Sequence, residues 1–404
     1  MRSIVVVGAS LAGLRAAEAL REAGFDGAIT VVGDEPHLPY DRPPLSKQVL
    51  AGDWDLDRVA LTGPGAGAGA DPDLRLDWRL GERAVDLDVA ARSVTLASGE
   101  RLAFDGLVVA TGATPRALPG TAGLDGVHLL RTVDDCLALR ADLDRTPRRV
   151  VVVGAGFIGA EVAATCRRRG LEVTLLEALP VPLGRVFGPE LGTVFADLHR
   201  DHGVDVRLGA GVAGIDGQGR VERVRLQDGG TVDADVVVVG IGVVPNTDWL
   251  EGSGLTLADG VECDQTCLAA PGVVAAGDVA RWSNPRFGQV MRVEHWENAV
   301  TQGQHAGRRL LAGDAAFPPY DPVPWFWSDQ YDRKIQLAGV CAPDDQVELV
   351  EGSLAERRFV AFFGRAGRLV GVLGFNRPRP VMQYRNLIAE GASLEHALAV
   401  VKEG

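Results

Sequence analysis

The sequence predicts an α/β protein with two parallel-sheet domains and a smaller β-rich segment towards its C-terminal end. Three observations lead to this prediction: a buried-strand run that enters a glycine turn and a helix, a second copy of that pattern in the middle of the chain, and a proline-rich boundary before the last part. At 404 residues the chain is too long for one ordinary hydrophobic core, so two or three domains are expected.

The first copy of the pattern occupies residues 3–35. A continuous apolar run, typical of a strand buried on both faces, is followed by a glycine turn, a helix-forming stretch and a second β-type run. These elements are predicted over 4–7, 8–13, 14–23 and 28–32.

The turn of the first copy reads GASLAG, with glycines at Gly8 and Gly13 and with Ser10 in place of the usual middle glycine. Gly8 allows a tight turn, the helix N-terminus attracts pyrophosphate, and an acid after the second strand, Asp34 or Glu35, accepts hydrogen bonds from a ribose. We therefore predict a dinucleotide site, in which the small side chain of Ser10 narrows the approach to the phosphates without closing it. Taken alone, this copy is also consistent with a helix N-terminus that binds nothing.

The second copy predicts a second dinucleotide site. Its turn has all three glycines and reads Gly154-Ala155-Gly156-Phe157-Ile158-Gly159, and the acid that closes the unit is Glu177. The strand before the turn, and the helix and strand after it, are predicted over 149–153, 160–169 and 172–176. One such motif is a weak signal, but two in the same strand–turn–helix–strand–acid context are a strong one.

Three further apolar runs end on small residues, which let a ligand approach the backbone. They are 107–112 with Thr111 and Gly112, 235–242 with Gly240 and Gly242, and 272–278 with Gly277 and Asp278. The carboxylate of Asp278 can accept a hydrogen bond from a polyol. Capping the next helix is an alternative role for Asp278, and both roles can hold together.

The remaining stretches set the domain boundaries. Residues 63–73 are low in complexity and are predicted to be a mobile surface loop. The proline-rich stretch 317–324 marks a boundary, after which the C-terminal segment begins. The C-terminal segment begins with 325–331 and is expected to be β-rich, with strands over 359–363 and 369–375 and closing helices over 381–389 and 394–402. A hairpin is also expected over 92–96 and 100–102.

The composition excludes several classes of protein. Hydrophobic residues make up 46% and charged residues 24%, which is typical of globular chains. The formal net charge of −13 argues against a nucleic-acid partner. No apolar run approaches the length of a membrane-spanning helix, and the N-terminal run is too short for a signal peptide, so no membrane partner and a cytoplasmic location are expected.

The five cysteines are widely scattered and include no C-x-x-C pair; they are Cys136, Cys166, Cys263, Cys267 and Cys341. This pattern fits reduced thiols better than a disulfide framework. Cys263 and Cys267 are four residues apart but have no histidine or further cysteine nearby. We therefore expect no metal site.

Two dinucleotide sites in one chain suggest a tightly held flavin and an exchanging nicotinamide nucleotide, a pairing that serves hydride transfer. Glu177 indicates NADH, because its carboxylate should bond the ribose diol and repel a 2′-phosphate. No arginine follows Glu177 before Arg185.

At this point the chain resembles a known family over its whole length. The likeness rests on GASLAG and GAGFIG, YDRPPLSK at 40–47, LVVATG at 107–112, VAAGDVAR at 274–281 and PWFWSDQY at 324–331. These motifs resemble the two-dinucleotide-domain FAD/NAD(P) reductases of the pyridine nucleotide-disulphide oxidoreductase superfamily, and within them the putidaredoxin reductase-like ferredoxin reductases. The last motif is the most specific, since generic members of the superfamily lack it.

The resemblance implies an α/β fold with two Rossmann-like three-layer dinucleotide-binding domains and a C-terminal α+β domain. The FAD domain would comprise 1–111 and 242–319, interrupted by an NAD domain at 112–241. The C-terminal domain, 320–404, would cover the flavin.

The same resemblance implies a set of residues around FAD, namely Ala12, Asp34, Lys47, Ala84, Arg131, Asp278 and Trp296. Asp34 matches the first ribose acid better than Glu35, although either side chain can reach. In similar reductases the lysine of PPLSK, here Lys47, pairs near the flavin N5 with the glutamate after the second turn, here Glu161. A cation there would stabilise negative charge on the ring. The alternatives are a solvated loop lysine and a first-turn acid favoured by the helix dipole.

The position of the cysteines also bears on function. Disulfide reductases of the superfamily carry a redox cysteine pair near the flavin, and peroxide-reducing relatives carry a single cysteine. Here no cysteine precedes Cys136, which falls in a predicted helix between the domains. Electrons would therefore leave the flavin for an external acceptor, and a 2Fe–2S ferredoxin suits their release one at a time. Trp325 and Trp327 would shield or bridge the flavin edge, or would be plain core aromatics.

Docking of an acidic ferredoxin on this acidic chain requires a local positive patch. The candidates are Arg281, Arg308, Arg309, Arg333 and Lys334. The alternative is that these charged side chains only lie on a solvent-exposed face and bind no partner. Gln304 stands where several relatives have a basic residue, which leaves the partner's identity open. The chain is expected to be a monomer or a homodimer.

The leading hypothesis is an NADH-dependent ferredoxin reductase that serves a haem monooxygenase or a ring-hydroxylating dioxygenase. A second is an NADH oxidase or quinone reductase. A third, from another class, is a flavoprotein like apoptosis-inducing factor, in which NADH changes association and turnover is incidental.

Overall fold

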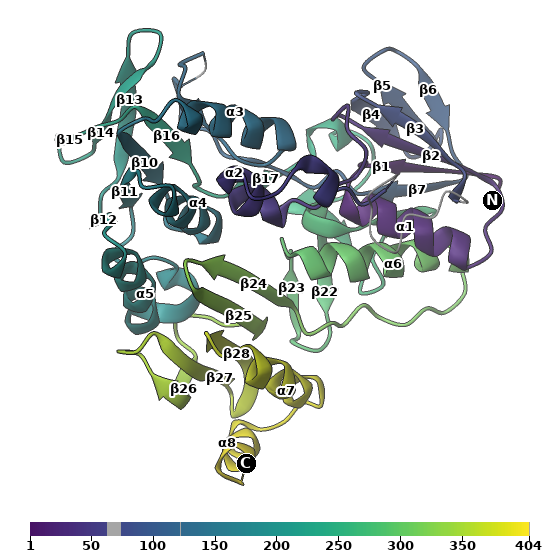
Figure 1. Ribbon diagram of the computed structural model, residues 1–404. Helices are drawn as coiled ribbons and strands as arrows, with labels where there is room; N and C mark the ends of the chain where they lie inside the picture. Colours follow the sequence, from purple (N-terminus) through teal and green to yellow (C-terminus); the bar gives the residue numbers. More distant parts are fainter. Residues whose placement is uncertain (63–73, 122, 404) are drawn as a thin grey trace. The chain divides into compact units, whose positions relative to one another are not determined.

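The computed structural model describes residues 1–62, 74–121 and 123–403, so the loop predicted at 63–73 lies outside the described residues. The chain divides into two compact units, each built from three separate stretches (Figure 1). Unit 1 comprises Met1–Asp41, Leu56–Thr114 and Val244–Pro324, and unit 2 comprises Arg42–Asp55, Pro115–Val243 and Trp325–Gly404. The three predicted domain boundaries stay a prediction.

Unit 1 is organised around a largely parallel sheet whose central strand is the first apolar run. Its strands are β1 (Ser3–Val7), β2 (Ala28–Gly33), β3 (Leu76–Leu80), β7 (Gly106–Val109), β20 (Leu268–Ala270) and β21 (Val273–Ala275), in the order β20-β21-β7-β1-β2-β3. β1 pairs in parallel with β2 and β7. Its residues Ile4 to Val7 are at most 3% exposed, which explains why the run is apolar throughout.

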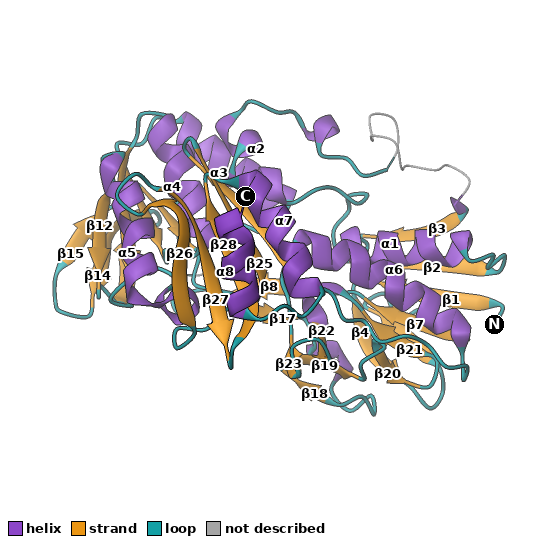
Figure 2. Cartoon of the chain, turned by 90° about the horizontal axis from the view of Figure 1, so that it is seen from below, coloured by secondary structure: helices purple, strands orange, loops and turns teal. Residues whose placement is uncertain are grey.

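The sheet of unit 1 is the middle of three layers. The helices α1 (Leu11–Glu22) and α6 (Trp296–Ala312) lie side by side on one face, as Figure 2 shows. Ile4 and Val6 belong to the core on the helical side, and Val5 and Val7 belong to the core on the other side, as strand alternation requires.

The second face is covered by shorter strands. They are β4 (Ala84–Asp88), β5 (Ser93–Leu96) and β6 (Arg101–Ala103) in one meander, and β18 (Leu257–Ala258), β19 (Gly260–Cys263), β22 (Ala280–Asn284) and β23 (Gln289–Met291) in a four-stranded sheet. Two further strands, β8 (Ala113–Pro115) and β17 (Val243–Pro245), pair with each other.

Unit 2 repeats this build. Its parallel sheet has the order β12-β11-β10-β16-β9, from β9 (Val127–His128), β10 (Arg149–Val153), β11 (Glu172–Glu177), β12 (Asp205–Leu208) and β16 (Val236–Val239). A meander of β13 (Val212–Gly217), β14 (Val221–Leu226) and β15 (Thr231–Asp233) precedes β16, as the first meander precedes β7. The duplication therefore extends beyond the glycine motifs to the sheet order and the inserted meander.

The helices of unit 2 include the short segment that follows the proline pair at Pro43–Pro44. Before its C-terminal part, unit 2 has the helices α2 (Gln48–Ala51), α3 (Val133–Asp144), α4 (Phe157–Arg168) and α5 (Gly184–Asp201). A short 3₁₀ turn, η1 (Pro43–Ser46), leads into α2.

The C-terminal part of unit 2 is an antiparallel sheet with helices. The strands β24 (Trp325–Gln330), β25 (Arg333–Gly339), β26 (Gln346–Ser353), β27 (Arg358–Arg365) and β28 (Arg368–Phe375) have the order β24-β25-β28-β27-β26. Phe187 and Phe195 of α5 belong to the same aromatic core as Phe363 and Phe375 of this sheet. The chain closes with α7 (Pro378–Ala389) and α8 (Leu394–Glu403).

Both motif helices begin three residues earlier than the sequence predicted. α1 begins at Leu11 and α4 at Phe157, because Ser10 and Gly156 already occupy the extended N-cap position. The second half of each glycine turn is therefore the first turn of the helix. Among the described residues, no helix is both long and apolar enough to cross a membrane.

A buried carboxylate in unit 2 predicts a pH-dependent stability. The Asp142 carboxylate lies 2.8 Å from His128 Nε2 and 3.0 Å from an Arg220 nitrogen. Burial alone would raise the pKa of Asp142, but hydrogen bonds from His128 and Arg220 outweigh burial and lower it. A lowered pKa stabilises the fold above the unfolded-state pKa of about 4, and this contribution is lost as the pH falls further.

We expect Asp142→Asn to lower the free energy of unfolding at pH 7 by about 1–3 kcal/mol. The difference from the wild type should shrink below about pH 4, where Asp142 itself becomes protonated. Thermal midpoints measured from pH 7 to pH 3.5 test this, with Asp53→Asn as the control because Asp53 pairs with Arg168 at the surface. An equal difference at every pH would contradict the assignment.

Candidate functional site

The glycine turn of unit 1 leads directly into the N-terminus of α1. Gly8 has φ +125°, and a Cβ there would lie 2.0 Å from the carbonyl oxygen of Ala110. A Cβ on Gly13 would lie 2.0 Å from the carbonyl oxygen of Gly8. Among the described residues, no side chain caps α1 at Ser10. Backbone N–H groups at such an end attract an anion, so the turn fits a dinucleotide phosphate.

The turn of unit 2 has the same build and one difference. Gly154 has φ +99°, and a Cβ there would lie 2.2 Å from the carbonyl oxygen of Gly240. A Cβ on Gly159 would lie 2.0 Å from the carbonyl oxygen of Gly154, whereas one on Gly156 would meet no described atom within 4 Å. The space over Gly156 is therefore open, and Ile158 beside it is exposed.

The acids that follow the second strand of each dinucleotide motif differ in their surroundings. Asp34, after β2, is exposed, whereas the Glu35 carboxylate accepts a hydrogen bond from the hydroxyl of Tyr40. Glu177, at the end of β11, accepts hydrogen bonds from the backbone N–H groups of Ala155 at 2.9 Å and Leu179 at 2.8 Å. Glu177 is thus fixed directly beside its glycine turn.

Small residues at the strand ends of unit 1 are held together by Asn246. Its side-chain amide donates to the carbonyl oxygen of Thr111 at 2.8 Å, and its backbone N–H donates to Gly112 at 3.0 Å. A Cβ on Gly277 would lie 2.9 Å from that of Ala12, so these two predicted residues are in close contact. Asn246 was not singled out from the sequence, because its side chain completes a turn whose partners are over 130 residues away.

The other predicted flavin residues fall in both units. In unit 1, Ala84 is buried in β4, and the indole N–H of Trp296 donates to Asp41 at 2.7 Å. Burial raises the pKa of the Asp41 carboxyl, although the Trp296 hydrogen bond works against that shift. Asp278 lies in unit 1, whereas Arg131 lies in unit 2 and its carbonyl oxygen accepts a hydrogen bond from Arg42.

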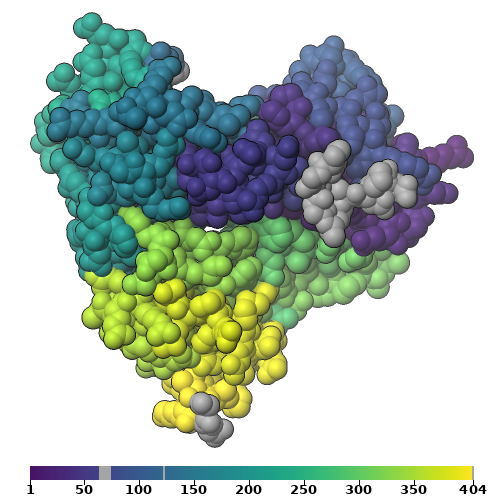
Figure 3. All heavy atoms as spheres, in the orientation of Figure 1, coloured from purple at the N-terminus to yellow at the C-terminus, as the bar shows by residue number. Residues whose placement is uncertain are grey.

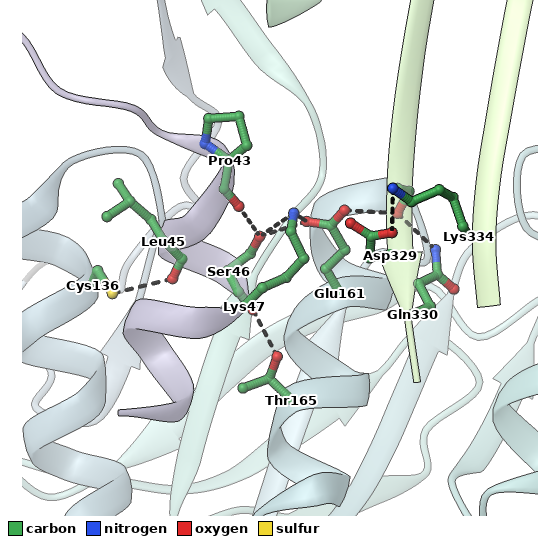
Figure 4. Close-up of polar contacts among 11 residues, drawn as sticks. Pro43, Leu45, Ser46, Lys47, Cys136, Glu161, Thr165, Asp329, Gln330 and Lys334 are labelled. Carbon is green, nitrogen blue, oxygen red and sulfur yellow. Dashed lines mark hydrogen bonds and ion pairs between the residues drawn. The ribbon is translucent and has the colours of Figure 1, made fainter. Parts of the chain in front are cut away.

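In unit 2 the structure brings Lys47 and Glu161 into direct contact. Lys47 Nζ lies 2.7 Å from Glu161 Oε2, as Figure 4 shows, and the two residues are 9% and 3% exposed. The segment 42–55 that carries Lys47 reaches the surface elsewhere, where it appears in indigo in Figure 3. Burial argues against a solvated loop lysine, and Glu161 is the fifth residue of α4, beyond the first helical turn.

Three further polar residues surround this pair and were not singled out from the sequence. The hydroxyl of Ser46 donates to Glu161 Oε2, and the hydroxyl of Ser328 on β24 donates to Glu161 Oε1 at 2.7 Å. The Gln330 amide donates to Ser328 Oγ at 3.2 Å. The alternation of side chains along β24 is a sequence signal that could have found Ser328 and Gln330, because it places both on the same face as Phe326.

The opposite face of β24 carries two tryptophans. The rings of Trp325 and Trp327 stack with centroids 5.2 Å apart and planes 28° from parallel. Phe326, on the first face, contacts Phe157 of the second glycine turn at a centroid distance of 4.6 Å. Both tryptophans are partly buried.

None of the five cysteines forms a disulfide in the structure. All five are free, and burial raises the pKa of Cys136, Cys166, Cys263 and Cys341 to about 12. Cys136 lies in α3, as predicted, and its Sγ donates to the carbonyl oxygen of Leu45 at 3.1 Å. Among the described residues, no group of three or more potential metal ligands occurs.

One docking candidate needs correction. Arg309 is only 7% exposed and donates to Thr266 and to the carbonyl oxygen of Gly313, so it cannot contribute to a docking surface. The other four candidates each pair with a carboxylate of this chain. These pairs are Arg281 with Glu262, Arg308 with Glu22, Arg333 with Asp332 and Lys334 with Asp329.

Known proteins match the chain along its whole length. Residues 2–303 match the family described as pyridine nucleotide-disulphide oxidoreductase, and residues 325–402 match the one described as reductase C-terminal. Rhodocoxin reductase of Rhodococcus erythropolis is 40% identical over 391 residues, which cover 96% of this chain and 89% of that protein.

Two further matches have similar coverage. The ferredoxin–NAD(+) reductase component of an anthranilate 1,2-dioxygenase system from Burkholderia cepacia is 39% identical over 391 residues, covering 96% of this chain and 94% of that protein. The solved structure of a covalent putidaredoxin reductase–putidaredoxin complex has a TM-score of 0.91 at 32% identity, covering 100% of this chain and 99% of that chain.

Two of the three glycines in the second turn, Gly156 and Gly159, should respond differently when each is replaced by alanine. Gly156→Ala should leave the thermal midpoint unchanged, because its Cβ meets open space, but should weaken dinucleotide binding by about 1–3 kcal/mol through the lost close approach. Gly159→Ala should lower the thermal midpoint, because its Cβ collides with the backbone. Calorimetry and titration of both variants with NADH test this, and a destabilised Gly156→Ala would contradict the assignment of open space.

Proposed function

Because the chain belongs to the pyridine nucleotide-disulphide oxidoreductase family, we propose that it is an FAD-dependent NADH:ferredoxin oxidoreductase. The observation that carries this proposal is the pair of equivalent glycine turns, one in each unit, each leading directly into the N-terminus of a helix. Such a pair suits one resident and one exchanging dinucleotide. The raised pKa values of the unpaired thiols support an external acceptor as the destination of the electrons.

FAD is proposed to bind tightly at the first turn. Gly8, Ser10, Ala12 and Gly13 would hold the pyrophosphate, and the exposed Asp34 suits the ribose better than Glu35, whose carboxylate is engaged by Tyr40. The remaining members of the proposed set are Lys47, Ala84, Thr111, Gly112, Arg131, Gly277, Asp278 and Trp296.

NADH is proposed to exchange at the second turn. The open space over Gly156 would take its pyrophosphate, with Phe157, Ile158 and Gly159 opening the helix and Gly240 and Gly242 at the neighbouring strand end. Glu177, fixed by two backbone N–H groups, would accept the hydroxyls of the ribose.

Lys47 and Glu161 are proposed to act at the flavin. When bound, the flavin supplies hydride acceptance and the release of electrons one at a time. Lys47 would place a positive charge beside it, and Glu161 holds that ammonium in one position. Trp327, stacked on Trp325, would shield the site from water.

The electron acceptor is proposed to be a 2Fe–2S ferredoxin that serves a haem monooxygenase or a ring-hydroxylating dioxygenase. The names of the similar proteins support this assignment. The docking candidates are Arg333 and Lys334 on β25, which pair with Gln330 and Asp329 of the tryptophan-bearing strand β24, together with Arg281 and Arg308. We propose a cytoplasmic location and a monomer or homodimer.

The function is tested by stopped-flow reduction with NADH, followed by cytochrome c reduction with and without an added 2Fe–2S ferredoxin. Strong stimulation by the ferredoxin is the expected result. Rapid oxygen or quinone reduction that is indifferent to ferredoxin would replace the proposal by an oxidase or quinone reductase. Slow reduction with an NADH-dependent change in oligomeric state would replace it by a flavoprotein like apoptosis-inducing factor.

Coenzyme preference gives a separate prediction. Glu177→Ala should raise the KM for NADH and weaken the preference over NADPH by about 1–3 kcal/mol, the scale of a lost hydrogen bond to a charged group. Glu177→Gln is the matched control, because it removes the charge but keeps an acceptor for Ala155 or Leu179. Steady-state kinetics with both coenzymes measure the effect. Unchanged discrimination in both variants would show that Glu177 is not the ribose acid.

A further inference from the structure

The Glu161 carboxylate is held by donors from two parts of unit 2 that are distant from it in the sequence. Lys47 Nζ at 2.7 Å and the Ser46 hydroxyl both contact Oε2, and the Ser328 hydroxyl contacts Oε1 at 2.7 Å. Ser46 and Lys47 come from the end of η1, Glu161 from α4 and Ser328 from β24. A carboxylate bonded through both oxygens has a fixed rotation about its last side-chain bond.

Gln330 fixes the direction of the Ser328 proton. Its amide nitrogen lies 3.2 Å from Ser328 Oγ, and both side chains are fully buried. Because this N–H donation occupies a lone pair of the Ser328 oxygen, the hydroxyl proton is left to point at Glu161. The reverse amide orientation would draw that proton to Gln330 and set the oxygen lone pairs of Ser328 against the ionised carboxylate. The orientation with nitrogen towards Ser328 is therefore the one that leaves the Ser328 hydroxyl free to donate to Glu161.

The register between β24 and α4 makes this contact specific. Phe326 and Ser328 are two residues apart on one face of the strand, and Phe157 and Glu161 are four residues apart on one face of the helix. Phe326 contacts Phe157, and Ser328 contacts Glu161. The aromatic contact thus sets the position along the helix at which the hydroxyl meets the carboxylate.

We propose that Ser328, aimed by Gln330, is a positioning residue that fixes the Glu161 carboxylate and, through it, the Lys47 ammonium. This inference rests on the proposed function in that the ion pair is the charge that acts at the flavin. Without the Ser328 hydroxyl, Oε1 loses its donor, the carboxylate is held through Oε2 alone, and the position of the partner of Lys47 is less fixed.

The chain offers a direct readout, because it has only three lysines: Lys47, Lys334 and Lys402. Timed labelling of the purified flavoprotein with an amine-reactive reagent, followed by mass spectrometry, gives a rate for each lysine. Lys47 should react slowly in the wild type, since its side chain is 11% exposed and ion-paired. Lys402, which is exposed on α8, is the internal reference.

In Ser328→Ala we expect the labelling rate of Lys47 to rise about ten-fold relative to Lys402, the scale of one lost hydrogen bond to a charged group. Gln330→Leu, which keeps the buried volume, should raise the rate in the same direction by a smaller factor. Glu161→Gln sets the upper limit. Ser253→Ala removes another buried hydroxyl, in unit 1, and should leave the Lys47 rate unchanged.

The proposal is overturned if Ser328→Ala labels Lys47 at the wild-type rate, or if Ser253→Ala raises that rate equally. A kinetic readout accompanies the labelling: Ser328→Ala should lower kcat with NADH and leave KM unchanged, whereas a general loss of structure changes both. Labelling needs neither NADH nor ferredoxin. A failure of the positioning role is therefore distinguishable from a failure of the reductase assignment.

Discussion

Moving an ammonium and a carboxylate from water into a protein interior costs several kcal/mol per ion unless each charge finds hydrogen-bonding partners. Lys47 and Glu161 offset this cost together, with Ser46 and Ser328 completing the set of donors to the carboxylate. The four residues belong to η1, the residue directly after it, α4 and β24. Neither charge is satisfied until these segments have come together, so the ion pair constrains how unit 2 is assembled.

Stability alone does not account for this ion pair, because well-packed hydrophobic side chains of similar volume often stabilise a protein equally or better. A buried charge of this kind therefore points to a role in chemistry. In the proposed reductase, the chain supplies what the flavin itself lacks, a positive charge of fixed position in a dry environment. The surroundings favour a fixed charge, since the donors leave Glu161 little freedom to turn.

The sequence predicted those features whose causes are local. Four consecutive apolar residues, a glycine with no room for a Cβ and an acid at the next strand end can be read within 35 residues, and each was found twice. The resemblance added the pairing of Lys47 with Glu161. Ser328 and Asn246 were missed, because their partners lie 167 and 135 residues away. Alternation along β24 places Ser328 on the face of Phe326, but no local pattern marks Asn246 as a hydrogen-bonding partner of a distant turn.

The two faces of β24 connect these observations. One face carries Phe326, Ser328 and Gln330 and is fixed against α4, and the other carries the stacked Trp325 and Trp327. Because successive side chains of a strand point to opposite faces, a slip of one residue would exchange these roles and leave Glu161 facing an indole. The same register of β24 therefore fixes Glu161 and places the tryptophans. The register that provides hydrogen-bond donors for a buried carboxylate also determines which aromatic rings border the proposed flavin site.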